Sequence, residues 1–208
     1  VYQALDTNTT GRYNTSIGIG SLTANTDGEF NVGLCGYALS SNTTADNNTA
    51  AGYAALGSNT TASNNTAFGY YALQANTTGT NNVAVGKGSQ LSTTNGNYNV
   101  SVGTNSLDAN TGGASNTAIG QNALTANTTA SNNTALGASA LAAATTQGNL
   151  TAVGYQALAA NTSGDSNTAV GYLALTASTT GSANTAVGLS ALDANTTGGS
   201  NTGIGAGA

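Results

Sequence analysis

A glycine that follows a hydrophobic residue recurs with a period of 17, or a multiple of it, through this 208-residue chain. These glycines are Gly18, Gly52, Gly69, Gly86, Gly103, Gly120, Gly137, Gly154, Gly171, Gly188 and Gly205. Cys35 stands at the one missing position, one period after Gly18, so the repeat continues through it. A fixed period of this length is typical of a repeat architecture, and the chain holds twelve units and a short remainder.

With Asn14 as the first residue of a unit, the consensus is N-T-A-V-G-Y-x-A-L-x-A-N-T-T-G-x-N. The second position is Thr or Val and the fourth is hydrophobic, from Ile17 to Ile204. Alternate residues of a strand share one face, so these two positions predict a short strand with both side chains in the core. Leu at the ninth position, broken only by Gln90, predicts a second short strand, A-L-x-A, with Leu inward.

Helices are excluded because each unit contains a glycine and an N-T-T-G or N-T-T-A cluster, which leaves no uninterrupted stretch of about 10 to 12 residues. One unit of two short strands cannot bury a core, but stacked units can. The sequence therefore predicts an all-β fold: a parallel β-solenoid, or β-roll, of about twelve 17-residue rungs. At about 4.8 Å per strand, the rungs form a rod about 57 Å long.

Composition excludes several classes of function. The chain has no His, two basic residues and seven acidic ones, so it has few groups for acid–base catalysis and lacks the clustered Lys and Arg that bind nucleic acid or anionic membranes. No apolar run reaches the length of a membrane-spanning helix. Disorder is disfavoured because 38% of the residues are hydrophobic and none is Pro. We expect neither an enzyme nor a cofactor or metal site.

Threonine fills the thirteenth position of every unit. The column comprises Thr9, Thr26, Thr43, Thr60, Thr77, Thr94, Thr111, Thr128, Thr145, Thr162, Thr179 and Thr196. Asn precedes Thr in most units, which favours turn chemistry and asparagine side chains that bond one another up the stack. The alternative is a surface ladder of threonines that contacts a ligand.

The third position is never larger than Ala or Ser, and the eighth is similarly small. If the fourth-position side chains point inward, the third position faces outward, and its small size predicts close approach by another copy of the solenoid. The predicted subunit interface comprises Ala50, Ala67, Ala84, Ala118, Ala135, Ala152, Ala169 and Ala186.

The stretch from Asn116 to Leu124, N-T-A-I-G-Q-N-A-L, resembles the repeats of trimeric autotransporter adhesin heads. It is also similar to the N-T-A-V-G-Y-x-A-L repeats of phage tail fibres. The resemblance spans nearly the whole chain, although the adhesin units are shorter than the unit of this chain. It implies a left-handed parallel β-roll, three chains per fibre, a location outside the cell, on its surface or on a virion, and binding or spacing without catalysis.

The remaining chemistry is sparse. The carboxylates are scattered, and Asp27 with Glu29 is the one close pair. We interpret this pair as solvated loop charges, with a weak cation site as the alternative. Cys35 is expected to be a small buried residue, with an inter-chain disulfide as the alternative. The tyrosines after the glycine column either pack along the rod or form a stripe for glycans. The Asn-x-Ser/Thr sites are a by-product of the repeat, and signal glycosylation only in a host with that machinery.

We therefore expect residues 1–208 to be a single, uncapped solenoid segment of a longer structural or adhesive fibre. Its expected partners are copies of itself, as a homotrimer, and a cell-surface glycan or host receptor; we expect no nucleic acid and no insertion into a membrane. The alternative is a monomeric solenoid that binds ice or another flat surface through the threonine ladder.

Overall fold

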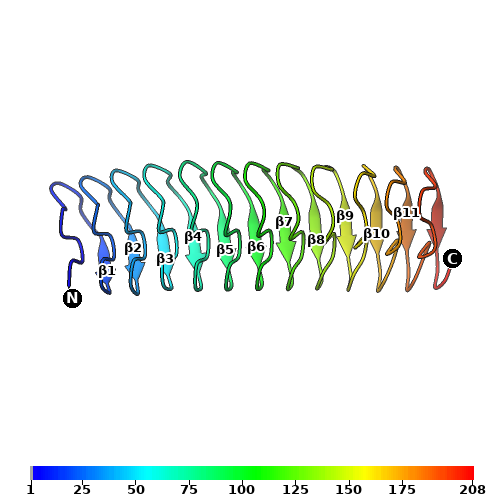
Figure 1. Ribbon diagram of the computed structural model, residues 1–208, viewed down its shortest axis with the longest axis horizontal. Helices are drawn as coiled ribbons and strands as arrows, with labels where there is room; N and C mark the ends of the chain where they lie inside the picture. Colours follow the sequence, from blue (N-terminus) through cyan, green and yellow to red (C-terminus); the bar gives the residue numbers. More distant parts are fainter. Residues whose placement is uncertain (1) are drawn as a thin grey trace.

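Each 17-residue unit makes one rung of a parallel β-solenoid in the computed structural model, which describes residues 2–208 (Figure 1). Every rung contributes one three-residue strand to a single sheet, and the strands follow one another in chain order. They are β1 (Thr15–Ile17), β2 (Val32–Leu34), β3 (Thr49–Ala51), β4 (Thr66–Phe68), β5 (Val83–Val85), β6 (Val100–Val102), β7 (Thr117–Ile119), β8 (Thr134–Leu136), β9 (Thr151–Val153), β10 (Thr168–Val170), β11 (Thr185–Val187) and β12 (Thr202–Ile204). The predicted fold class and rung length are confirmed; Val1 lies outside the described residues.

Equivalent residues of neighbouring rungs pair in register, as Ala169 of β10 does with Ala186 of β11. Backbone hydrogen bonds between rungs also continue around the rest of the circumference. The Leu56 N–H, for example, donates to the Ala72 carbonyl at 3.1 Å, on the side of the rung away from the sheet. Each rung therefore satisfies its backbone groups largely through the rungs above and below it, as a stacked structure requires.

The predicted second strand is wrong, because positions six to eleven of each unit form turns. The ninth-position leucines adopt left-handed backbone angles, with φ of 51° at Leu56 and 52° at Leu158. That conformation is incompatible with a strand. Their inward direction is nevertheless confirmed, since both side chains are fully buried.

The predicted direction of the first strand is also wrong. The third-position residues point into the solenoid, and the second and fourth positions point outward, as in β9, where Ala152 is buried and both neighbours are partly exposed. The alanines proposed as a subunit interface all lie in the chain's own core with no exposed surface: Ala50, Ala67, Ala84, Ala118, Ala135, Ala152, Ala169 and Ala186. They therefore cannot contact another copy.

Small residues are required inside because the leucine of the opposite wall fills the space. A Cβ added at Gly33 would lie 2.5 Å from Ser21 Oγ and 3.3 Å from Leu22 Cγ, so nothing larger than a methyl group could be placed there. The eighth-position alanines, such as Ala55 and Ala157, are buried beside the leucines for the same reason. Nearly every rung thus packs one leucine against two small side chains, and the columns form the hydrophobic core.

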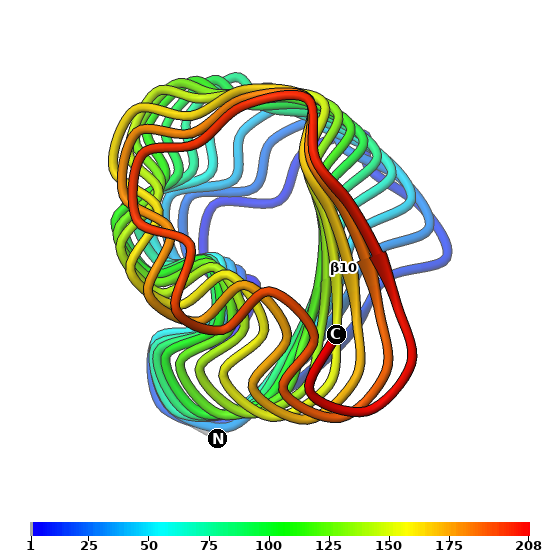
Figure 2. The same ribbon diagram turned by 90° about the vertical axis from the view of Figure 1, so that its right-hand side faces the viewer.

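Seen from the C-terminal end, the strands occupy one side of the cross-section and the turns form the other sides (Figure 2). The glycine after each strand lets successive backbones approach closely at one corner. Gly154, for example, has a φ of 131°, and a Cβ there would collide with the Gly171 carbonyl. Residues 2–208 contain no helix with the length and hydrophobicity needed to cross a membrane.

Candidate interaction surfaces

The outer face of the sheet is formed by the second- and fourth-position side chains, and we call it the outer sheet face. Large hydrophobic groups are exposed along it, from Ile17 in β1 to Ile204 in β12, and Phe68 is 44% exposed. None of the two basic and seven acidic residues occupies either position. The outer sheet face is therefore an uncharged, partly apolar strip that runs the length of the rod.

The sequence did not predict this exposed face, because the second- and fourth-position side chains were expected to lie in the core. One signal could have identified it: the fourth position tolerates every size from Ala51 to Phe68, whereas the third never exceeds Ser. A packed interior restricts volume, and a surface does not. The column that varies in size is therefore the outer one.

The thirteenth-position threonines lie at the surface, on a ridge formed by the N-T-T loops. Their hydroxyl groups donate to backbone carbonyls of the next rung, as Thr128 Oγ1 does to the Thr145 carbonyl at 3.2 Å and Thr179 Oγ1 to the Thr196 carbonyl at 3.1 Å. The local, structural interpretation of this column therefore accounts for the hydroxyl protons of most of its members. The fourteenth-position side chains beside it, such as Thr44 and Thr129, are more exposed.

Two ladders of buried asparagines run beneath this ridge. In the first, the Asn48 N–H donates to Asn31 Oδ1 at 3.0 Å. In the second, Asn59 Nδ2 donates to Asn42 Oδ1 at 2.9 Å. The Ala62 carbonyl accepts from Nδ2 of both Asn48 and Asn59, each at 2.9 Å, and so links the two ladders. The predicted asparagine ladder is confirmed.

The second ladder has three breaks, at Thr93, Ala144 and Ser178. The asparagine one rung before each break has a buried Oδ1 without a hydrogen-bond partner; these asparagines are Asn76, Asn127 and Asn161. In the unbroken rungs that oxygen accepts from the next asparagine. The side-chain amide is therefore the element that satisfies the ladder, and its loss leaves an unpaired buried acceptor.

The ladder also bears on glycosylation. Five of the noted sequon asparagines are fully buried members of the second ladder: Asn42, Asn59, Asn76, Asn127 and Asn161. Asn8 and Asn195 occupy the same column at the two ends and are partly buried. An N-linked glycan would have to replace one of the Nδ2 protons that the ladder uses, so the folded rod has no place for it at the buried positions.

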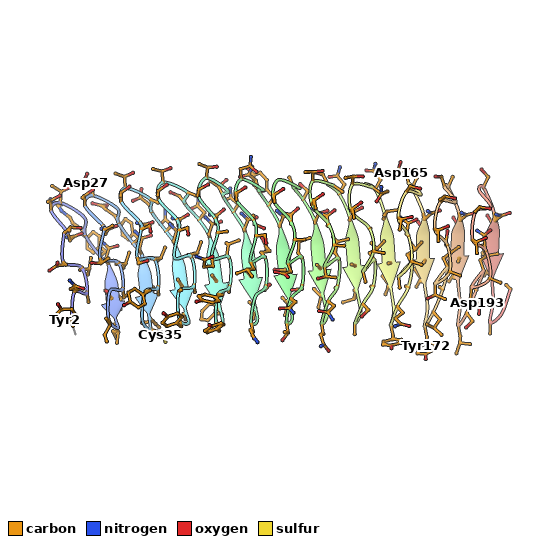
Figure 3. The ribbon with its side chains drawn as sticks, viewed as in Figure 1. Tyr2, Asp27, Cys35, Asp165, Tyr172 and Asp193 are labelled. Atoms are coloured by element: carbon orange, nitrogen blue, oxygen red, sulfur yellow. The ribbon has the colours of Figure 1, made fainter. Side chains whose placement is uncertain are left out.

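The Asp27 carboxylate lies on the threonine ridge, as Figure 3 shows. It accepts hydrogen bonds from Thr10 Oγ1 at 2.5 Å, Thr9 Oγ1 at 3.2 Å and Thr26 Oγ1 at 3.2 Å. The hydrogen bond from Thr10, followed by those from Thr9 and Thr26, lowers the pKa of Asp27. Glu29 takes no part in these hydrogen bonds, so the site is a single carboxylate bonded by threonine hydroxyls.

The tyrosines that follow the glycine corner stack along the rod, and the labelled Tyr2 and Tyr172 lie on the side opposite Asp27 (Figure 3). We call the row formed by Tyr2, Tyr53, Tyr70, Tyr155 and Tyr172 the aromatic ridge. The rings of Tyr53 and Tyr70 are 5.8 Å apart at 16°, and those of Tyr155 and Tyr172 are 5.4 Å apart at 17°. Packing along the rod is therefore confirmed, although these rings are also about half exposed. Ring faces that stack on neighbouring rungs are not free to stack on a sugar.

Cys35 is exposed, so the prediction of a small buried residue is wrong. The glycine corner that it occupies lies at the outside of the rod, next to the aromatic ridge (Figure 3). Its φ of 87° is one that glycine adopts more easily. An inter-chain disulfide stays a prediction.

The part of the chain that the structure describes forms no pocket, and it contains no group of three or more His, Cys, Asp or Glu side chains placed to hold a metal ion. The surfaces that remain are long and periodic: the outer sheet face, the threonine ridge and the aromatic ridge. Comparisons with protein-family models, with curated proteins and with solved structures gave no match to this chain.

Proposed function

We propose that this chain is a non-catalytic structural and adhesive fibre segment, a rod whose length is set by its rung count and which associates side by side with copies of itself. The observation that carries the proposal is the outer sheet face, which exposes hydrophobic side chains on rung after rung without a charge. A soluble monomer rarely exposes a continuous apolar strip of this length.

The size of the face suits a protein interface. Twelve strands of three residues give a strip about 57 Å long and about 10 Å wide. The tyrosines at the neighbouring sixth position, such as Tyr70 and Tyr155, widen it at their rungs, so the contact area approaches the roughly 800 Å² per partner of a stable interface.

A second copy of the chain is the partner that matches this strip best. Because every rung has the same height, two solenoids side by side keep their columns aligned over the whole length, which an unrelated surface would not do. The absence of charge on the face also removes like-charge repulsion between identical copies, even though the chain carries a formal net charge of −5. We propose a homotrimer, as the resemblance of the repeats to adhesin heads implies.

The test is the oligomeric state of the wild-type chain and of two charge variants, measured by light scattering and sedimentation. Val102→Asp with Val187→Asp places two carboxylates on the outer sheet face, where both side chains are exposed, and is expected to give folded monomers. Thr129→Asp is the matched control, because Asp27 occupies the same position of its unit, and it should assemble normally. A wild-type chain that stays monomeric at all concentrations would overturn the proposal.

The second candidate is a monomer that binds ice or another flat, ordered surface. One observation favours this candidate, but it concerns the second-position threonines and not the predicted thirteenth-position column. The second-position threonines, such as Thr151 and Thr168, form an in-register row on the outer sheet face. No hydrogen bond within residues 2–208 occupies their hydroxyl groups, unlike those of the thirteenth position. Clear thermal hysteresis from a monomeric wild-type chain would favour this candidate over the fibre.

Partners beyond the chain itself and an extracellular location stay predictions. The aromatic ridge is the part of the rod that a glycan would contact, but its rings stack on one another. Binding of cell-surface glycans by the wild-type chain, compared with a Tyr155→Ala and Tyr172→Ala variant on a glycan array, tests the adhesive part of the proposal. Equal binding by both chains would exclude this ridge as the adhesive surface.

A further inference from the structure

One rung near the middle of the rod is the only one in residues 2–208 with a polar residue in place of the core leucine. The rung of residues 82–98 has Ser89 and Gln90 where the consensus has Ala and Leu. The next rung has Ser101 and Ser106 at its third and eighth positions. All four side chains are fully buried, so this level of the core is polar.

The hydrophobic core is divided at this level. One cluster of buried residues extends from Leu22 to Ala84, and the other extends from Leu107 to Ala191. Between them, the core positions hold the four polar side chains. The strands remain paired across the division, since Val83 of β5 pairs with Val100 of β6. The discontinuity is therefore confined to the side chains inside the solenoid.

The polar group is only partly satisfied. Gln90 Nε2 donates to the Val83 carbonyl and to Ser101 Oγ, each at 2.9 Å. The Ser89 hydroxyl contacts those of Ser101 and Ser106. Gln90 Oε1, however, is buried without a partner. A partly satisfied buried network stabilises less than the apolar packing that it replaces.

The second asparagine ladder is broken in the same rung. Thr93 replaces the ladder asparagine, which leaves Asn76 Oδ1 unpaired and the contact from Asn110 Nδ2 to Thr93 Oγ1 long, at 3.4 Å. Leucine packing and the second ladder thus weaken at one level, while the first ladder stays bonded across it, where the Asn99 N–H donates to Asn82 Oδ1 at 2.9 Å. The other two ladder breaks, at Ala144 and Ser178, fall within the continuous hydrophobic cluster.

We propose that rung 82–98 is a joint that divides the solenoid into two cooperatively folded blocks and is the place where the interior of the rod opens first. The stability of a solenoid is approximately a sum over neighbouring-rung interfaces, so the weakest interface decides where the stack separates. A rod under load would yield at this predefined level with both blocks still folded. The joint does not depend on the fibre function.

Native-state hydrogen exchange on the whole chain tests the joint at equivalent amides. The N–H groups of Leu56, Gln90 and Leu141 all donate to the eighth-position carbonyl of the next rung. In a uniform solenoid that frays from its ends, the central Gln90 amide would be the most protected. We expect it to exchange about tenfold or more faster than the other two, because an unsatisfied buried group weakens its interface. Equal or slower exchange at Gln90 would overturn the proposal.

Two sets of substitutions test the polar core directly: one removes the joint, and the other creates a second one. Ser89→Ala, Gln90→Leu, Ser101→Ala and Ser106→Ala together restore the consensus core and should slow exchange at residue 90 to the level of Leu56. The reverse set, Ala140→Ser, Leu141→Gln, Ala152→Ser and Ala157→Ser, imports the polar group into rung 133–149 and should create a second fast-exchanging level there. Unchanged exchange profiles in both variants would show that the polar core does not form a joint.

Discussion

At the residue scale, side-chain amides contribute to the fold as backbone amides do in a sheet. Asn59 Nδ2 donates both to Asn42 Oδ1 and to the Ala62 carbonyl, so one side chain bonds within its rung and to the rung before it. Because these groups are fully buried, an unpaired amide lowers the free energy of unfolding by more than a paired amide raises it. The breaks in the ladder are therefore places where a single substitution can stabilise the protein.

Ala144→Asn is expected to stabilise the solenoid by completing the ladder. The new amide would donate to Asn127 Oδ1, which is now unpaired, and accept from Asn161 Nδ2. Two further buried hydrogen bonds correspond to a gain of about 1 to 2 kcal/mol in the free energy of unfolding. Urea denaturation measures this gain, and Ala142→Asn, at a half-buried position outside the ladder, is the control. An equal effect of both substitutions would contradict the role of the ladder.

Asp108 is expected to make stability depend on pH. Partial burial raises its pKa above the ordinary value, and its Oδ1 has no hydrogen-bond partner. Since the folded state holds the proton more tightly than the unfolded state, Asp108 destabilises the fold once it is ionised, and this cost disappears as the pH falls through its pKa. Asp108→Asn should therefore raise the melting temperature at pH 7 but not near pH 3. A gain that is the same at both pH values would rule out this cause.

At the element scale, three columns of residues adopt positive φ angles and exclude β-branched side chains throughout. They are the seventh, ninth and seventeenth positions, represented by Asn122, Leu124 and Asn132. A β-branched side chain is strongly disfavoured at positive φ, which explains why the buried ninth position is Leu and never Ile or Val. This pattern is a signal in the sequence that distinguishes the turn from a strand.

Leu158→Ile tests this constraint at constant volume. The side chain stays hydrophobic, but its branched Cβ is strained at the φ of 52° that the turn requires. We expect a loss of about 2 kcal/mol or more, against less than about 1.5 kcal/mol for Leu158→Met, which is unbranched at Cβ. Thermal unfolding of the two variants gives the comparison. Equal stability of both would show that volume alone selects leucine here.

Strand β10 offers a direct test of which face is inside. Ala169→Asp would bury an unpaired carboxylate, which costs several kcal/mol unless it is protonated. Val170→Asp, one residue later, places the same group on the partly exposed outer sheet face and should leave the chain folded. Limited proteolysis is expected to cleave the Ala169 variant near residues 165 to 180. Cleavage of the Val170 variant instead would reverse the assignment of the two faces.

At the scale of the whole molecule, the rung is the unit that the fold adds or removes. Every strand pairs with the equivalent strand of the adjacent rung, and no contact between strands skips a rung. Stability and length should therefore change in steps of one rung, as in other solenoids with nearest-neighbour coupling.

Deletion of residues 116–132, one complete unit, is expected to give a folded and shorter solenoid, because β6 can then pair in register with β8. Deletion of residues 116–124 removes fewer residues, but the incomplete rung cannot close around the core. We expect the shorter deletion to lower the melting temperature more. Circular dichroism during thermal unfolding measures the order of the two, and the opposite order would contradict closure by whole rungs.

The sequence by itself determined the period, the rung count and the columns that run along the rod. Repetition of glycine, leucine and asparagine at fixed spacing is direct evidence for stacking, since equivalent residues must occupy equivalent surroundings. It also placed the asparagine ladder and the inward leucines, because buried amides and large aliphatic side chains each have one favourable arrangement in a stack.

Only the tertiary structure decided which face of the strand is inside and which conformation the chain adopts after the glycine corner. Both faces of a three-residue strand such as Thr151–Val153 are apolar enough to be buried, so the alternation of side chains does not determine which face lies inside. The decision depends on the opposite wall, where a leucine held at a left-handed φ fills the narrow interior and leaves room only for a methyl group. The larger valine must therefore face outward, and the surface that it forms is the one available to a partner.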